Sequence, residues 1–63
     1  MIYLASNIKY DTDNEDVNLP KEIEINVPDD IKGVGNIVEF ISDEITEITS
    51  FLVIRFTFQT KEQ

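Results

Sequence analysis

The chain has 63 residues, with five lysines and arginines against 13 aspartates and glutamates, which gives a formal net charge of −8. It contains no Cys, His or Trp, which excludes disulfides, thiolate and imidazole nucleophiles and the usual zinc ligands. A chain this acidic is repelled by DNA, RNA and anionic lipid headgroups. We therefore expect no direct nucleic-acid binding, no membrane binding and no cofactor.

The size and composition predict one small folded domain over residues 1–63. Ile, Leu, Val and Phe are frequent enough to form a core despite the net charge. The start of the chain shows neither the basic region nor the apolar run of a signal peptide, and no segment is apolar enough to span a membrane. We expect a cytoplasmic protein.

Residues 2–10 alternate between two sets of side chains, as a strand does. Uninterrupted alternation places on one face Ile2, Leu4, Ser6, Ile8 and Tyr10, and on the other Tyr3, Ala5, Asn7 and Lys9. The acidic run at 11–16 predicts a solvated loop that ends near Pro20. A second strand is predicted over 21–27, where apolar residues alternate with Glu and Asn before Pro28.

A helix is predicted over about 37–49, after a loop that contains two glycines. Asn36 is its predicted N-cap, and Glu39 is placed to complete a capping box. The apolar arc of this helix comprises Ile37, Val38, Ile41, Ile45 and Ile48, with Phe40 on its flank. Glu39, Asp43 and Glu47 follow one another at intervals of four residues on the opposite face. Glu44 lies near the edge of the arc and needs either a solvent route or a cation, for which Lys9 or Arg55 is available.

The last apolar segment predicts a strand over about 51–59. If side chains alternate along this strand, those facing the helix are Leu52, Ile54, Phe56 and Phe58. Those facing away from it are Phe51, Val53, Arg55 and Thr57. The outward set is half apolar, which predicts either a central position for this strand or another surface that covers this face.

The predicted fold class is α+β, in the order ββαβ, with a three-stranded antiparallel sheet of order 2-1-3 and the helix on one face. The last strand then lies at an edge, and an apolar edge is an aggregation hazard unless it is paired. Pairing with a second copy through residues 51–58 would give a six-stranded sheet, with Phe51, Val53, Arg55 and Thr57 as the predicted dimer edge.

Three segments carry a resemblance to a known group: Asn7–Asp13, Glu15–Ile25 and Ile41–Glu44. Together they resemble very short acidic proteins of bacteria and their phages or mobile elements. In that group a strand ends in a Tyr/Trp-Asp-x-Asp step, a Val-x-Leu-Pro loop leads into Glu-Ile-Glu-Ile, and a helix carries a Ser-Asp-Glu segment. The resemblance implies a small accessory protein of a mobile element and supplies no catalytic residues.

The acidic loop also fits part of a calcium-loop template, with Asp11, Asp13, Glu15 and Glu22 at positions 1, 3, 5 and 12. Position 6 holds Asp16 where the template needs glycine, and the flanks predict strands where the template has helices. We therefore predict no metal site and interpret the run as a solvated loop.

The acidic surface itself is the strongest functional feature, because twelve of the 13 carboxylates lie between Asp11 and Glu47, against Lys21 and Lys32. Carboxylates on a rigid element can imitate a row of phosphates and occupy the basic groove of a nucleic-acid-binding protein. The predicted partner-binding residues are Glu39, Asp43, Glu47, Asp11, Asp13, Glu15 and Asp16. The alternative interpretation is an ordinary amphipathic helix that turns its charged face to water and binds no partner there.

The residues permit two other functions. Paired carboxylates can act as general acid and base, but this needs a cleft, for which a site around Glu44 would be the sign; we predict that the chain is not an enzyme. The alternative to an acidic protein-binding accessory or inhibitory protein is a structural homodimer or assembly module that uses the apolar strand 51–58.

Overall fold

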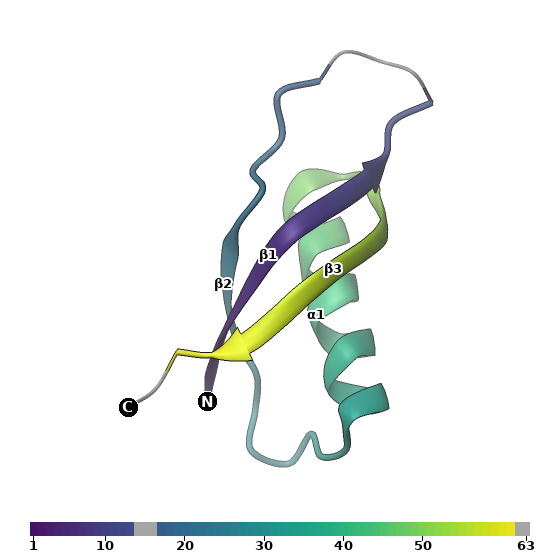
Figure 1. Ribbon diagram of the computed structural model, residues 1–63. Helices are drawn as coiled ribbons and strands as arrows, with labels where there is room; N and C mark the ends of the chain where they lie inside the picture. The colour runs from purple at the N-terminus through teal and green to yellow at the C-terminus, as the bar shows by residue number, and fades with distance from the viewer. Residues whose placement is uncertain (14–16, 62–63) are drawn as a thin grey trace.

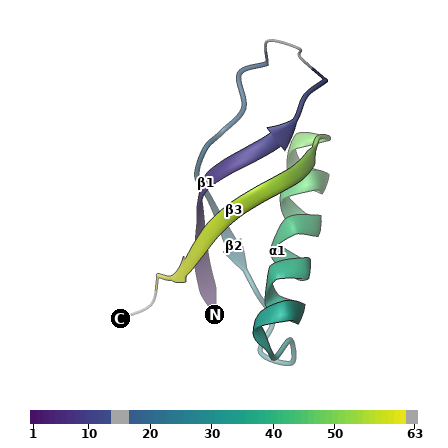
Figure 2. The same ribbon diagram turned by 45° about the vertical axis from the view of Figure 1, so that its right-hand side comes forward.

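The computed structural model describes residues 1–13 and 17–61 and has two layers, a sheet and one helix packed on one face of it (Figures 1 and 2). In chain order the elements are β1 (Ile2–Asp11), β2 (Ile23–Asn26), α1 (Val34–Thr49) and β3 (Leu52–Thr60). The sheet is antiparallel with the order β2-β1-β3, so β1 is central and β2 and β3 form the two edges. The predicted α+β fold, its ββαβ order and its strand order are confirmed.

The helix begins earlier than predicted, and its predicted cap is wrong. Gly33, at φ 89°, precedes the first turn, and its carbonyl accepts a hydrogen bond from the N–H of Ile37 at 3.0 Å. Asn36 therefore lies inside the first turn, where its Nδ2 donates to the Lys32 carbonyl at 2.8 Å. No side-chain capping bond forms at this end of α1, so the predicted capping box with Glu39 is absent. Glycine suits the position because its backbone reaches positive φ without a Cβ clash.

The β1–β3 ladder contains two compensating irregularities. Between Ser6 and Lys9, β1 advances three residues while β3 advances two, from Thr57 to Arg55. One step later β3 advances two residues, to Val53, while β1 advances one. Each strand thus carries one extra residue, as in a β-bulge, and Asn7 has the positive φ of 52° that a bulge on β1 needs. Beyond both bulges the original register is restored.

The bulges change which side chains face the helix. The residues of these two strands that lie in the core or pack against it are Tyr3, Ala5, Ile8, Tyr10, Val53, Phe56 and Phe58. Uninterrupted alternation was therefore wrong in separating Tyr3 and Ala5 from Ile8 and Tyr10, and in turning Val53 away from the helix. Leu52 and Ile54, predicted to face the helix, are 66% and 58% exposed. Of the predicted outward set, Arg55 and Thr57 are exposed, whereas Phe51 and Val53 are half-buried.

The core lies between the sheet and one side of α1. Its buried members are Ala5, Ile8, Ile25, Val27, Ile41 and Ile45. Ile41 and Ile45 are one helical turn apart, and both are 0% exposed. Ala5 is equally buried at the centre of the sheet, where its single methyl group lets the helix approach closely. Tilted ring contacts extend the core toward the edge, with centroids 5.7 Å apart for Tyr3–Phe58 and 6.0 Å apart for Phe56–Phe58.

Candidate partner-binding surface

The acidic ridge consists of Glu39, Asp43 and Glu47, which lie on α1 away from the sheet and are all exposed. Four residues of helix advance about 6 Å, so the three carboxylates form a row along the axis. The row is rigid because the opposite side of the same helix carries the buried Ile41 and Ile45. The sequence prediction that these three side chains share an exposed face therefore agrees with their placement.

No lysine or arginine neutralises the ridge within residues 1–13 and 17–61. The ion pairs of this part of the chain lie elsewhere, between Lys61 and Glu24 on the sheet and between the N-terminal amine and Asp29 at 3.5 Å. Lys9 and Arg55 lie opposite each other in the β1–β3 register, on the sheet face that the helix does not cover. Neither is ion-paired with Glu44, which is half-buried, so of the two predicted options for that carboxylate the solvent route remains.

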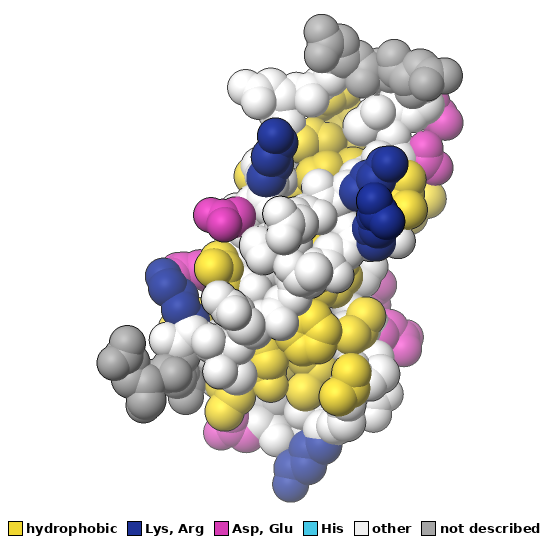
Figure 3. All heavy atoms as spheres, in the orientation of Figure 1, with side chains coloured by type: hydrophobic (Ala, Val, Ile, Leu, Met, Phe, Trp, Pro, Cys, Tyr) yellow, Lys and Arg dark blue, Asp and Glu magenta, His cyan; other side chains and the backbone are white. Residues whose placement is uncertain are grey.

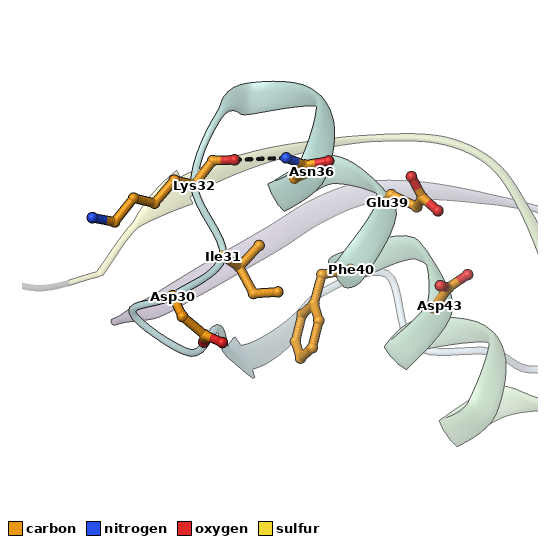
Figure 4. A pocket seen from close by; sticks show the side chains of 7 residues that line it. All are labelled: Asp30, Ile31, Lys32, Asn36, Glu39, Phe40 and Asp43. Carbon is orange, nitrogen blue, oxygen red and sulfur yellow. Dashed lines mark hydrogen bonds between the residues drawn. The ribbon is translucent and has the colours of Figure 1, made fainter.

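A hollow of about 290 Å³ lies beside the first half of the ridge, between α1 and the loop that precedes it (Figure 4). It is lined by Asp30, Ile31, Lys32, Asn36, Glu39, Phe40 and Asp43. The side chain of Ile31 and the ring of Phe40 lie next to each other and form its apolar wall, while carboxylates come from both the loop and the helix (Figure 4). The hollow therefore combines an apolar wall with a rim on which three carboxylates outnumber one lysine.

The loop is held against the helix by three local features. The N–H of Ile31 donates to the Pro28 carbonyl at 3.0 Å, which closes a turn. Asn36 fixes the far end of the loop through its bond to the Lys32 carbonyl (Figure 4). Gly33 supplies the positive φ that turns the chain into the helix. Asp30 and Ile31 are thereby held opposite Glu39 and Phe40.

The remaining predicted site residues do not join the hollow. Asp11 pairs with Leu52, which places it at the end of the molecule where α1 ends, whereas the hollow lies where α1 begins (Figure 1). Asp11 and Asp13 are exposed. Glu15 and Asp16 lie outside the described residues. The structure thus brings Glu39 and Asp43 together with Asp30 and leaves the residues of the acidic loop apart from them.

Sequence reasoning did not single out Ile31 and Phe40 as parts of a site. Phe40 was assigned to the flank of the apolar arc, which is its position on the helix, but its neighbour across the hollow comes from the loop. The sequence feature that could have indicated a site is that Phe40, an aromatic residue next to Glu39, lies on the flank of the apolar arc and not within it.

The sequence raised two other kinds of site, a metal site and a cleft around Glu44. Within the described residues, no three acidic side chains are grouped so that they could hold a metal ion, and Glu44 lines neither the hollow beside the ridge nor a second one. The second hollow, about 280 Å³, lies under the start of α1 around Tyr3, Val27 and Ile37. No helix among the described residues is long and apolar enough to cross a membrane.

The fold alters the titration of Tyr10. Its hydroxyl donates to the Pro20 carbonyl at 2.6 Å, and burial raises the pKa of Tyr10 above its ordinary value. The bond ties the end of β1 to the segment that leads into β2. This role is structural, because Tyr10 is remote from the hollow.

Comparison with known proteins gives no match to any family model, to any curated protein or to any solved structure. The resemblance to short acidic proteins of mobile elements therefore stays a prediction from the sequence.

Proposed function

We propose that this chain is a small accessory or inhibitory protein of the cytoplasm that docks its acidic ridge and the adjoining hollow on a basic surface of a protein partner. The observation that carries the proposal is that one concave site combines an apolar wall with exposed carboxylates that form no ion pair among the described residues, although Lys32 also lines the site. A row of carboxylates alone is an ordinary solvated helix face. The hollow adds an apolar wall, which a helix face that is only solvated does not require.

A lysine or arginine side chain fits the chemistry of the hollow. Its aliphatic stem would pack on Ile31 and Phe40, and its charged head would meet the carboxylates of Glu39 and Asp43. The rest of the ridge would then follow neighbouring cations of the partner, which is how a nucleic-acid mimic occupies a basic groove. A net charge of −8 speeds the encounter with such a surface and makes binding sensitive to salt.

The test is an NMR titration of the protein with an arginine-rich peptide at low and moderate salt. We expect the largest shift changes at Phe40 and Asp43, and about tenfold weaker binding for Glu39→Gln combined with Asp43→Asn, since each exposed charge pair contributes up to about 1 kcal/mol. The control combines Glu22→Gln with Glu24→Gln on the β2 side of the sheet, which removes the same charge.

If both double variants weaken binding equally, attraction is only to net charge and the site proposal is wrong. If the peptide shifts residues of the sheet and leaves α1 unchanged, the acidic ridge is not the docking surface.

A further inference from the structure

The two edges of the sheet are protected to different degrees. β2 has four residues, is preceded by Pro20 and followed by Pro28, and carries Glu24 at its centre. Short strands, prolines and charges are the usual means of blocking further strand pairing. β3 has nine residues, contains neither proline nor an acidic side chain, and has β1 as its strand neighbour within the described chain. The β3 edge is open to pairing.

The backbone groups on this edge can be assigned from the hydrogen bonds to β1. The N–H of Lys61 donates to the Ile2 carbonyl at 2.9 Å, so the backbone of Lys61 points toward β1. Backbone direction alternates along an antiparallel strand, and Gln59 and Thr57 therefore point the same way. Phe56, Phe58 and Thr60 present their N–H and C=O groups to the open edge.

Apolar side chains accompany these backbone groups. Phe56 and Phe58 lie on the helix side of β3 and are half-buried. Figure 3 shows hydrophobic side chains gathered at the surface beside the lower part of β3. A pairing strand would cover part of this surface.

The helix flank that faces β3 carries no charge. At 100° per residue, Val38, Ser42 and Thr46 lie on the side of α1 opposite Phe40, and all three are half-buried. Phe40 faces the loop that follows β2. The helix therefore turns its carboxylates outward and toward β2, and its small neutral residues toward the β3 edge.

We propose that the β3 edge pairs with the β3 edge of a second copy of this chain, in a two-fold symmetric dimer with a continuous six-stranded sheet. Two chains of charge −8 repel each other least where both contacting surfaces lack carboxylates, because salt screens the more distant charges; residues 52–61 with the neutral flank of α1 form such a surface. An antiparallel edge is also complementary to itself under a two-fold axis.

The outward backbone groups favour one register. A two-fold axis at Thr57 pairs Phe56 of one copy with Phe58 of the second copy, as hydrogen-bonded residues on the helix side. It also sets Arg55 opposite Gln59 of the second copy on the uncovered face. Shifting the axis by one residue toward the C-terminus sets Arg55 opposite Lys61, which like charge disfavours.

The test is sedimentation equilibrium over a concentration series, with Gln59→Lys and Gln59→Glu as the two edge variants. We expect Gln59→Lys to raise the dimer dissociation constant about tenfold, because it faces Arg55 twice in each dimer, and Gln59→Glu to lower it by a similar factor. The control is Asn26→Lys, at an exposed position of β2, which adds the same charge as Gln59→Lys. It should strengthen the dimer slightly, since it only reduces the net negative charge by which the two copies repel each other.

Hydrogen exchange supplies the second readout. The amide of Phe58 points to the open edge and should be protected in the concentrated dimer and exchange quickly when the protein is dilute. The amide of Gln59, which points toward β1, should be protected in both. A monomeric mass at all concentrations would overturn the proposal, as would a dimer in which Gln59→Lys and Phe58 exchange show no effect. The variants of Glu39 and Asp43 should leave the dimer intact, so the two proposals fail separately.

Discussion

The two faces of the sheet share one backbone but differ in their surroundings, because α1 covers one face and leaves the other uncovered. The face under α1 holds Ala5, Ile8, Ile25 and Val27, all buried. The uncovered face carries Lys9 opposite Arg55 and Ser6 opposite Thr57, with a hydrogen bond of 3.0 Å between the Ser6 and Thr57 hydroxyls. Figure 3 views the molecule from the side of β3 remote from α1, and lysine and arginine side chains lie on it beside apolar ones.

This difference depends on the bulges more than on alternation. Without an extra residue in β1, Ile8 would share a face with Ser6 and Leu4, and Lys9 would point at the helix. The compensating bulge in β3 restores the pairing for Tyr10 and Asp11. Two local irregularities thus keep the apolar residues of both strands on one side of the sheet.

The largest expected effect is on the covered face. Ile41→Ala leaves a cavity at a fully buried position and should lower the free energy of unfolding by about 3 kcal/mol. Ile54→Ala, on a residue 58% exposed, should cost less than about 1 kcal/mol. Urea titration followed by circular dichroism measures both, at concentrations where the protein is monomeric. Equal losses would mean that Ile54 is buried in solution.

The bulge itself should give the next largest effect. Asn7→Val places a β-branched residue at φ 52° and should destabilise the fold by about 1–2 kcal/mol. Asn7→Gly accepts this backbone conformation and should be close to neutral. The same urea titrations compare the two variants. If valine is tolerated as well as glycine, β1 does not have the positive φ at this position.

A smaller effect is expected on the uncovered face. Ser6→Ala removes an exposed hydrogen bond to Thr57 and should cost about 0.5 kcal/mol. A double-mutant cycle with Thr57→Val isolates this contact from other consequences of either change. The coupling energy should have the sign of a favourable contact, and its absence would show that the two hydroxyls are solvated independently.

The smallest effect concerns Tyr10 and appears only in alkaline solution. Its pKa is raised by burial in the folded state, so its contribution to stability is complete below the ordinary tyrosine pKa of about 10 and is lost as the pH rises through the raised value. Between about pH 9 and pH 11, thermal unfolding of the parent chain should lose more stability than that of Tyr10→Phe. Parallel curves for the two proteins would contradict the shift.

Local patterns of the sequence determined the class and order of the elements. The alternation in residues 23–27 and the four-residue spacing of Glu39, Asp43 and Glu47 specify a strand and an exposed helix face, because both periods are properties of neighbouring residues. The strand order is the simplest one in which the first two strands pair antiparallel and the chain returns through the helix to the other side of the first strand. The ridge could therefore be predicted without a structure.

Tertiary structure alone decided the faces of β1 and β3, the start of α1 and the hollow. A bulge depends on which residues of two distant segments pair, and only Asn7, a residue that tolerates positive φ, marks it locally. The hollow likewise needs Ile31 from the loop against Phe40 from the helix. Sequence periodicity fixes the direction of each side chain relative to its neighbours, whereas packing between segments decides what that side chain meets.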